Sequence, residues 1–301
     1  MPAIESDLLL RYYRRMPELP EVQTTVDGLN KYAKGRTITA VSTTYNSKFY
    51  KGKEEIKNPE FFKIFQKKVV GQKILKAERR AKNILIHLSS GETILAHMKM
   101  TGYFFYNAPE DAEFVRLSFT LDNSKRLAFS DMRKFAKVTL LESKTIHDSI
   151  HLKNLGPEPL DIKFTYPIFK SQLLKHAKGR VKTVLMDQSL ISGIGNIYSD
   201  EILWRAGVHP VSLVGKIPEK NLKEMFKATK ETLQKGIDFG GDSMSDYKNI
   251  EGKKGQFQDH HRAYRRTGKT CEKKGCKGVI KRLVVGTRSA HFCDKHQKLF
   301  K

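Results

Sequence analysis

The stretch Leu185-Met186-Asp187-Gln188, followed by Gly193-Ile194-Gly195-Asn196-Ile197-Tyr198, decides the architecture of the second half of the chain. It joins two helical patterns, at residues 181–191 and 196–206, and its glycines permit a tight turn from one helix into the next. Asn196 is a suitable cap for the second helix, whose first backbone N–H groups attract a phosphate. The stretch therefore predicts a helix–turn–helix unit with an anion-binding turn.

Outward from this turn, hydrophobic periodicity divides the chain into two parts. Helical patterns at 166–177 and 218–235 extend the second part, and the Pro-rich segment Leu155–Leu160 predicts a linker before it. In the first part, a helix begins near Pro20, and residues 37–141 then contain short β runs separated by turn residues. These runs predict an antiparallel sandwich or barrel. They are Ile38–Val41, Ile84–Leu88, Ile94–His97, Leu117–Leu121 and Ala136–Leu140.

The charge balance indicates the class of partner. Among 301 residues, 56 are Lys or Arg and 32 are Asp or Glu, which gives a net charge of +24. Residues 252–301 hold 15 of the basic residues and 3 of the acidic ones. An excess of this size favours a polyanionic partner, with nucleic acid the first candidate. No apolar run of about 18 residues is present, and residues 1–15 lack the pattern of a secretory signal, so we expect no membrane partner.

The cysteines and one histidine near the C-terminus predict a metal site. Cys271-x4-Cys276 and Cys293-x2-His296 form two ligand pairs. Three thiolates and one imidazole complete the tetrahedral shell of a structural Zn²⁺ ion. The run between the pairs predicts a β-hairpin too small for a core of its own, so metal binding would supply its folding energy. His291 is an alternative for the fourth ligand, with less suitable spacing.

Several motifs share their order with one known family. They are Met16-Pro17-Glu18-Leu19-Pro20-Glu21-Val22, Arg80-Ala81-Lys82-Asn83-Ile84-Leu85, His97-Met98-Lys99-Met100-Thr101-Gly102, Asp131-Met132-Arg133-Lys134-Phe135, the turn at 185–198, and Gly286-Thr287-Arg288 after the first cysteine pair. From Met16 to the C-terminus, the chain resembles the formamidopyrimidine-DNA glycosylases, which are bacterial enzymes of base-excision repair.

The resemblance implies a covalent mechanism. Enzymes of this family use an N-terminal proline amine as nucleophile, here Pro17, which attacks the sugar C1′ and expels the damaged base. An α-amino group titrates at roughly 7.7–8.0, so a usable fraction is unprotonated. The resemblance makes Glu18 the proton donor and gives Glu21 a part in organising the pocket. Lys82 and Arg288 correspond to the residues that transfer protons during β- and δ-elimination.

Fifteen residues precede Met16, whereas the proline of the family follows the initiator methionine directly. A proline inside a chain has an amide nitrogen, which is not nucleophilic. We expect translation to start at Met16 and removal of this methionine to expose Pro17, so that residues 1–15 are absent from the mature protein. Proteolytic trimming and an inactive protein that keeps the extension are the alternatives.

The resemblance also implies how damaged DNA is recognised. A damaged base must leave the duplex, and another group has to fill the space. Met100, Arg133 and Phe135 match the void-filling residues of the family: the arginine pairs with the orphaned base, and the two apolar side chains wedge into the stack. The loop at 240–249 resembles one that closes over an extruded 8-oxoguanine. The expected phosphate contacts are Asn196, Lys82, Lys178, Lys182, Arg288 and Arg116.

These inferences predict an α+β protein that acts as a bifunctional DNA glycosylase and AP lyase on oxidised purines in damaged double-stranded DNA. Residues 16–150 would form a catalytic β-sandwich with a flanking helix, 151–262 a helix–two-turn–helix domain, and 263–301 a zinc hairpin. We expect one Zn²⁺ ion, no nucleotide cofactor, a monomer, and work on the chromosome in the bacterial cytoplasm. The alternatives are an oxidised-pyrimidine glycosylase of the endonuclease VIII type and a non-catalytic binder of damaged DNA.

Overall fold

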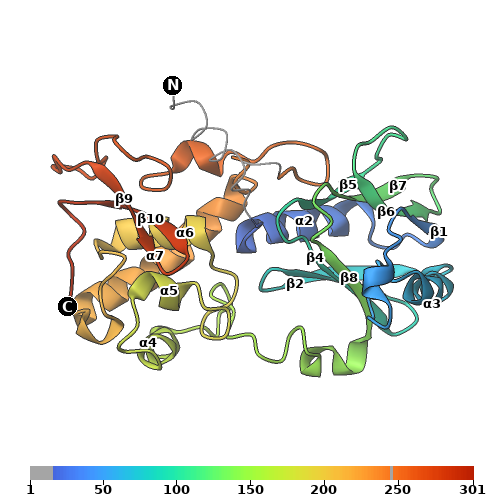
Figure 1. Ribbon diagram of the computed structural model, residues 1–301, viewed down its shortest axis with the longest axis horizontal. Coiled ribbons are helices and arrows are strands. Elements are labelled where there is room, and N and C mark those ends of the chain that lie inside the picture. The colour runs from blue at the N-terminus through green and yellow to red at the C-terminus, as the bar shows by residue number, and fades with distance from the viewer. Residues whose placement is uncertain (1–15, 245–246) are drawn as a thin grey trace. The chain divides into compact units, whose positions relative to one another are not determined.

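The computed structural model describes residues 16–244 and 247–301, and the predicted extension at residues 1–15 lies outside this part. Strands dominate the first half of the chain and helices the second (Figure 1), which confirms the predicted α+β class. The chain divides into two compact units. The β unit contains Pro17, Glu21–Leu152 and Gly240–Gly255, and the helical unit contains Glu18–Pro20, Lys153–Phe239 and Gln256–Lys301. Because residues 240–255 return to the β unit, single cuts at 150 and 262 do not separate the two units.

Two antiparallel four-stranded sheets form the β unit, as the sandwich prediction requires. The first has the order β1-β6-β7-β5 and the second the order β2-β3-β4-β8. Each β run predicted from the sequence falls on one of these strands. Their bounds are β1 Ile38–Thr43, β2 Ile74–Arg80, β3 Asn83–Leu88, β4 Glu92–His97, β5 Gly102–Tyr106, β6 Val115–Leu121, β7 Arg126–Asp131 and β8 Lys137–Glu142.

Helix α2, Leu19–Tyr32, flanks the sheets and shares their core. Its stripe of Val22, Val26 and Leu29 is buried among side chains from both sheets, as its periodicity predicts. Phe104 and Phe129 pack in the same core with their ring centroids 4.8 Å apart. The turns between these strands are therefore attached to a well-packed core.

Helix α3, Pro59–Val69, interrupts the region for which only β runs were predicted. Asn58 caps it by accepting a hydrogen bond from Glu60 N at 3.2 Å, and Pro59 occupies its first turn. Phe65 and Val69 then face the core. The Asn-Pro-Glu start signal is present in the sequence, so this helix was predictable from its cap.

The helical unit contains α4 Tyr166–Leu174, α5 Val181–Leu185, α6 Asn196–Ala206 and α7 Glu219–Asp238, and the hairpin of β9 Ile280–Val285 and β10 Arg288–Cys293. Helix α5 is shorter than predicted because the chain turns after Leu185, where the Asp187 carboxylate accepts hydrogen bonds from Ser189 N and Ser189 Oγ. Short 3₁₀ helices are η1 Lys48–Tyr50, η2 Ser143–Asp148, η3 Val214–Lys216 and η4 Phe257–His260. The predicted paired helices and C-terminal hairpin are thus confirmed.

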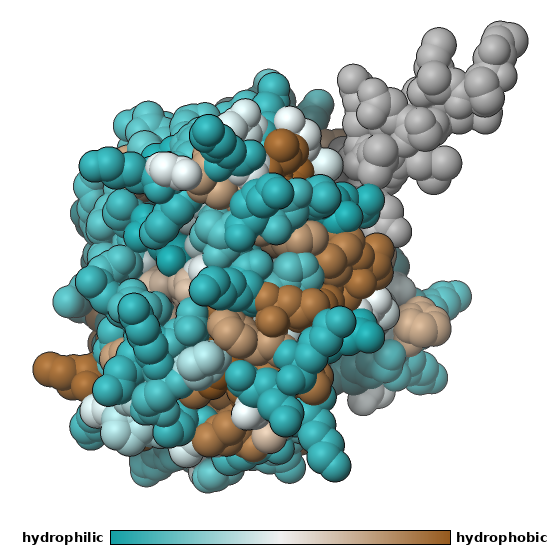
Figure 2. Space-filling view, turned by 90° about the vertical axis from the view of Figure 1, so that its left-hand side faces the viewer, coloured by the Kyte–Doolittle hydropathy of each residue, from teal (hydrophilic) through white to brown (hydrophobic). Residues whose placement is uncertain are grey.

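Hydrophilic side chains cover most of the face drawn in Figure 2, with a smaller group of hydrophobic ones among them. Within residues 16–244 and 247–301, no helix combines the length and the apolar character needed to cross a membrane.

Candidate functional site

Glu18 lies at the N-terminal end of helix α6. Its carboxylate is 3% exposed and accepts hydrogen bonds from Ile197 N at 2.9 Å and from Tyr198 N at 3.4 Å. Gly195 permits this approach, since a Cβ there would lie 2.3 Å from the Glu18 carboxyl carbon. A helix N-terminus stabilises a negative charge. The glycine of the predicted turn therefore brings the proposed proton donor to the helix start.

The start of helix α6 differs from the prediction. Gly195, rather than Asn196, is the N-cap residue, and the amides of Ile197 and Tyr198 that were expected to face a phosphate are taken by Glu18. A buried carboxylate competes for the same positive helix end, which explains the difference. The side-chain oxygen of Asn196 is buried without a hydrogen-bond partner. The side chain of Asn196 therefore remains a candidate for a phosphate contact, whereas the amides of Ile197 and Tyr198 do not.

Lys182 does not take the exposed position predicted for a phosphate contact. It is fully buried, and its Nζ donates to Asp200 Oδ1 at 2.5 Å and to Ser199 Oγ at 3.2 Å. The other carboxylate oxygen of Asp200 accepts from the backbone N of His291 at 2.9 Å. Reaching a phosphate would break a buried ion pair, which is strongly unfavourable. Lys182 is therefore a structural residue that joins α5, α6 and β10, and the prediction is corrected.

Three other predicted phosphate contacts differ in their solvent exposure and in their hydrogen bonds within the protein. Lys178, in the loop after α4, and Arg288, at the first residue of β10, are both exposed. Arg116 is half-buried, and its Nε donates to the backbone oxygen of Asp131 at 3.0 Å. Lys178 and Arg288 are thus open to a ligand, whereas Arg116 is already engaged in the β unit.

Glu21 connects helix α2 to the segment at 240–249 within the β unit. Its Oε1 accepts from Asp242 N at 2.7 Å, and its backbone oxygen accepts from the Tyr247 hydroxyl at 3.0 Å. Burial and the nearby Glu21 charge raise the pKa of Tyr247 well above its usual range, so the phenol stays protonated and donates. Glu21 therefore holds Asp242 and Tyr247 of the segment that resembles a base-covering loop, and residues 245–246 of that segment lie outside the described residues.

Lys82 occupies the β2–β3 turn, beside a group of cations. The turn is made by Ala81, whose φ is +54°, and the register pairs Asn83 with His97 on β4. Burial and the charges of Lys99 and Lys82 lower the pKa of His97 to about 3. His97 is therefore neutral near pH 7, and its Nδ1 accepts from Lys99 N at 3.0 Å. His97 begins the motif at 97–102, and its sequence context gives no sign of this burial.

Met100, Arg133 and Phe135 lie together although they come from two different turns of the β unit. Arg133 Nη1 donates to Met100 Sδ at 3.2 Å, and the Arg133 guanidinium carbon lies 4.6 Å from the centre of the Phe135 ring. Phe135 is 52% exposed. The cluster therefore combines the cation of Arg133 with the apolar side chains of Met100 and Phe135. The proposed wedge needs this combination.

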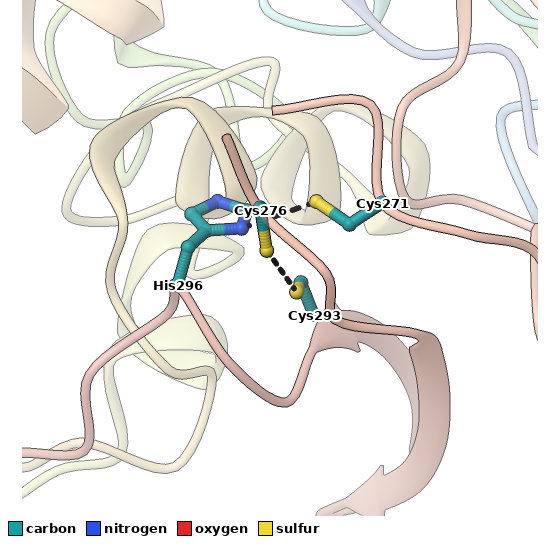
Figure 3. Close-up of side chains that lie close together, drawn as sticks. All are labelled: Cys271, Cys276, Cys293 and His296. Carbon is teal, nitrogen blue, oxygen red and sulfur yellow. Dashed lines mark hydrogen bonds between the residues drawn. The ribbon is translucent and has the colours of Figure 1, made fainter. Parts of the chain in front are cut away.

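The predicted metal ligands converge (Figure 3). Ligand atoms of Cys271, Cys276, Cys293 and His296 all lie within 4.8 Å of one another. Cys271 Sγ is 3.2 Å from His296 Nδ1, and the Sγ atoms of Cys276 and Cys293 are 3.6 Å apart. A tetrahedral zinc site with bonds of about 2.3 Å has ligands about 3.8 Å apart, so the donor set fits Zn²⁺ in chemistry and spacing.

The structure selects His296 over His291 as the fourth ligand. His291 Nδ1 lies 2.9 Å from Asp200 Oδ2, away from the cysteines. His296 Nε2 lies 2.9 Å from the backbone oxygen of Trp204, which leaves Nδ1 as the metal-facing nitrogen. Burial raises the pKa of Cys293 to about 11, and a bound dication would reverse that shift by stabilising the thiolate.

Three buried acids to which the sequence assigned no role hold these segments in place. Asp200 joins Lys182 to His291, and Glu201 accepts hydrogen bonds from the amides of residues 262–264. Asp131 is fully buried and accepts a hydrogen bond from Thr101, the residue after Met100. The position of the three acids inside apolar sequence patterns was the signal that could have identified them. An acid in such a pattern is expected to be buried, and a buried carboxylate needs several hydrogen-bond donors.

Comparisons with known proteins cover most of the chain. Residues 16–138 match the family described as "Formamidopyrimidine-DNA glycosylase N-terminal domain", and residues 155–248 match "Formamidopyrimidine-DNA glycosylase H2TH domain". The formamidopyrimidine-DNA glycosylase of Bacillus subtilis is 37% identical over 284 residues, which are 94% of this chain and 99% of that protein.

Solved structures of two DNA complexes are similar to this chain over nearly its whole length. The Lactococcus lactis Fpg protein in complex with DNA containing an abasic site superimposes with a TM-score of 0.82 at 29% identity, covering 93% of this chain and 99% of that one. A MutM protein in complex with DNA containing carbocyclic 8-oxo-G also gives a TM-score of 0.82 at 29% identity, with 94% and 100% coverage.

Proposed function

This chain belongs to the formamidopyrimidine-DNA glycosylase family, and we propose that it removes oxidised purines from duplex DNA and cleaves the strand as an AP lyase. The substrates would be 8-oxoguanine and formamidopyrimidines. The observation that carries this proposal is the fixed position of Glu18, directly after Pro17, at the start of helix α6. Relatives bound to abasic-site and 8-oxo-G DNA support the same substrate class.

Pro17 is the proposed nucleophile. Its nitrogen bonds to the sugar C1′, and the bond from C1′ to the base breaks with its electron pair leaving on the base, which then takes up a proton. This step needs a free amine, so we propose that the active form starts at Pro17. The family match, which begins at residue 16, supports this start.

Proton transfers complete the proposed reaction. Glu18, oriented by two backbone amides, would deliver a proton as the sugar opens. The iminium at C1′ then acidifies the C2′ hydrogen, and its loss expels the 3′ phosphate in β-elimination. Lys82 and Arg288 are the proposed residues for the transfers of β- and δ-elimination, since both are cations beside a β-turn.

Two further assignments belong to DNA binding. Met100, Arg133 and Phe135 would fill the space left by the extruded base, and Asn196, Lys178 and Arg288 would contact phosphates. The four ligands Cys271, Cys276, Cys293 and His296 would hold one Zn²⁺ ion, which stabilises the hairpin when bound. A chromosomal substrate implies work in the bacterial cytoplasm.

The test compares two forms of the full chain whose amino termini are verified by mass spectrometry. Protein that starts at Pro17 should cleave 8-oxoguanine duplex DNA and become covalently linked to it in borohydride, and protein that keeps residues 1–15 should do neither. Trapping of the verified long form would remove Pro17 from the mechanism and direct attention to Lys82. Lesion binding without trapping by the short form would identify a non-catalytic binder, and preference for oxidised thymine would identify the endonuclease VIII type.

A further inference from the structure

Asp131 is a buried carboxylate that has no role in the proposed chemistry. It is the last residue of β7, is fully buried, and accepts three hydrogen bonds. Thr101 Oγ1 donates at 2.6 Å, Ala136 N at 2.8 Å and the Tyr45 hydroxyl at 3.1 Å. A carboxylate removed from water needs donors of this kind, and hydrogen bonds to a charged acceptor are about twice as strong as neutral ones.

These donors come from three separate segments of the β unit. Tyr45 follows β1, Thr101 lies in the β4–β5 turn, and Ala136 lies in the β7–β8 turn. The Tyr45 and Thr101 donors are 86 and 30 residues away from Asp131 in sequence. One carboxylate therefore joins the two turns that carry Met100, Arg133 and Phe135.

The connection continues from Thr101 to the wedge residues themselves. Thr101 Oγ1 accepts a hydrogen bond from Arg133 N at 3.1 Å while its own proton goes to Asp131. Arg133 in turn donates to Met100 Sδ at 3.2 Å. Each hydrogen bond in this series restricts the next residue, so the position of Arg133 depends on the hydroxyl of Thr101.

The backbone at both turns is in the left-handed region. Lys99, directly before Met100, has a φ of +52°, and Lys134, between Arg133 and Phe135, has a φ of +58°. Residues with a side chain rarely adopt this conformation, and it persists only where the surroundings hold it. Two such residues beside the three proposed wedge residues indicate that the surrounding contacts hold both turns in this conformation.

We propose that Asp131 is a positioning residue which, through Thr101, sets Met100, Arg133 and Phe135 in their inserting arrangement before DNA binds. This inference rests on the proposed function, because it assumes that these three residues enter the space left by an extruded base. A preset wedge spares the loss of side-chain freedom that ordering on binding would require. The gain in affinity is expected on damaged DNA, since none of these hydrogen bonds involves Lys178 or Arg288, the exposed candidates for phosphate contacts.

The first test separates the hydroxyl of Thr101 from its bulk. Thr101→Val keeps the shape but removes the hydroxyl, and Thr101→Ser keeps the hydroxyl but removes the methyl. Dissociation constants are measured on duplexes with and without a tetrahydrofuran abasic-site analogue, and the fluorescence of 2-aminopurine opposite the analogue reports insertion. We expect Thr101→Val to lower the preference for the analogue about tenfold, the factor for one hydrogen bond, and Thr101→Ser to keep it within about threefold.

The second test uses the strained residue Lys134. Glycine adopts a positive φ without penalty, so Lys134→Gly should fold as stably as wild type and insert normally. In the Thr101→Val background, the same change should restore part of the lost preference, because the weakened hydrogen bonds then oppose less strain. Simple additivity of the two changes would contradict the proposal.

A matched pair of tyrosines controls for general damage to the sheets. Tyr45→Phe removes the donor to Asp131, whereas Tyr106→Phe removes a hydroxyl that accepts from Asn123 Nδ2 at 2.9 Å elsewhere in the same unit. We expect loss of insertion only for Tyr45→Phe. If the wild type excises 8-oxoguanine and every variant inserts like it, the role of Asp131 is wrong. If the wild type starting at Pro17 does not excise, the proposed function is what fails.

Discussion

The wedge turns of the β unit and the C-terminal hairpin hold their functional groups by different means. The wedge turns rest on an apolar core built from both sheets and α2, and a buried carboxylate joins them. The hairpin has a much smaller cluster, Trp204, Ala263, Cys271, Ile280 and Cys293, and two of these are candidate metal ligands. Folding of the sheets therefore positions the wedge, whereas the hairpin depends on its ligands.

Helix α6 compensates in part for the small core of the hairpin. Asp200 accepts from His291, Glu201 accepts from three successive amides at 262–264, and the Trp204 carbonyl lies 2.9 Å from His296 Nε2. These contacts attach the hairpin segment to the helix whose other end holds Glu18. Polar contacts to helix α6 therefore supplement the small apolar cluster of the hairpin.

The largest effect should follow loss of the metal. Cys293→Ser, like chelation of the wild type, should release zinc, unfold the hairpin and abolish DNA binding, because no apolar core replaces the ligands. Hydrogen exchange should show the hairpin amides opening while the β-unit strands stay protected. Wild-type DNA affinity in metal-free protein would contradict this prediction, because it would show that the hairpin folds without a metal ion.

A smaller loss should follow removal of the buried cation under the hairpin. Lys182→Ala leaves Asp200 buried without its ammonium partner, which should lower the free energy of unfolding by about 3–5 kcal/mol. Lys178→Ala, an exposed neighbour, is the matched control and should change stability by less than about 0.5 kcal/mol. The control should instead reduce the salt dependence of DNA binding by about one phosphate. Equal denaturation midpoints for the two variants would contradict the buried role of Lys182.

Arg133→Ala should affect recognition rather than folding. Its proposed partner is the orphaned base, so processing of 8-oxoguanine duplexes should fall while affinity for undamaged DNA stays within about twofold. Paired measurements of single-turnover excision and of binding to undamaged duplex test this. A uniform loss on all DNAs with a shallower salt slope would make Arg133 a phosphate contact.

The effect that is smallest near pH 7 is a pH dependence of stability that comes from one residue of the β unit, His97. The pKa of His97 falls from its ordinary 6.5 to about 3 on folding, so the unfolded chain binds more protons between these values. Stability should therefore decrease as the pH falls from about 6.5 towards 3, with a slope of at most about 1.4 kcal/mol per pH unit from this group. The free energy of unfolding, measured by denaturation at several pH values in this range, should depend less steeply on pH in His97→Gln. An unchanged dependence on pH would show that His97 is not its cause.

Local patterns accounted for the elements and for the metal site. The β runs, the stripe of α2 and the paired helices follow from hydrophobic periodicity, which depends on neighbours in sequence. The cysteine pairs with His296 follow from ligand spacing on short turns. Helix α3 was missed although its cap, Asn58 with Pro59, is equally local.

By itself, then, the sequence determined the two-part architecture, the metal ligands and the residues that resemble a repair enzyme. Only the tertiary structure decided which polar groups are buried together. Glu18 reaches amides 179 and 180 residues away, and Lys182 meets a carboxylate on the next helix rather than solvent. The physical reason is that a buried charge is stable only where several distant segments supply donors at once, and no local pattern encodes that meeting.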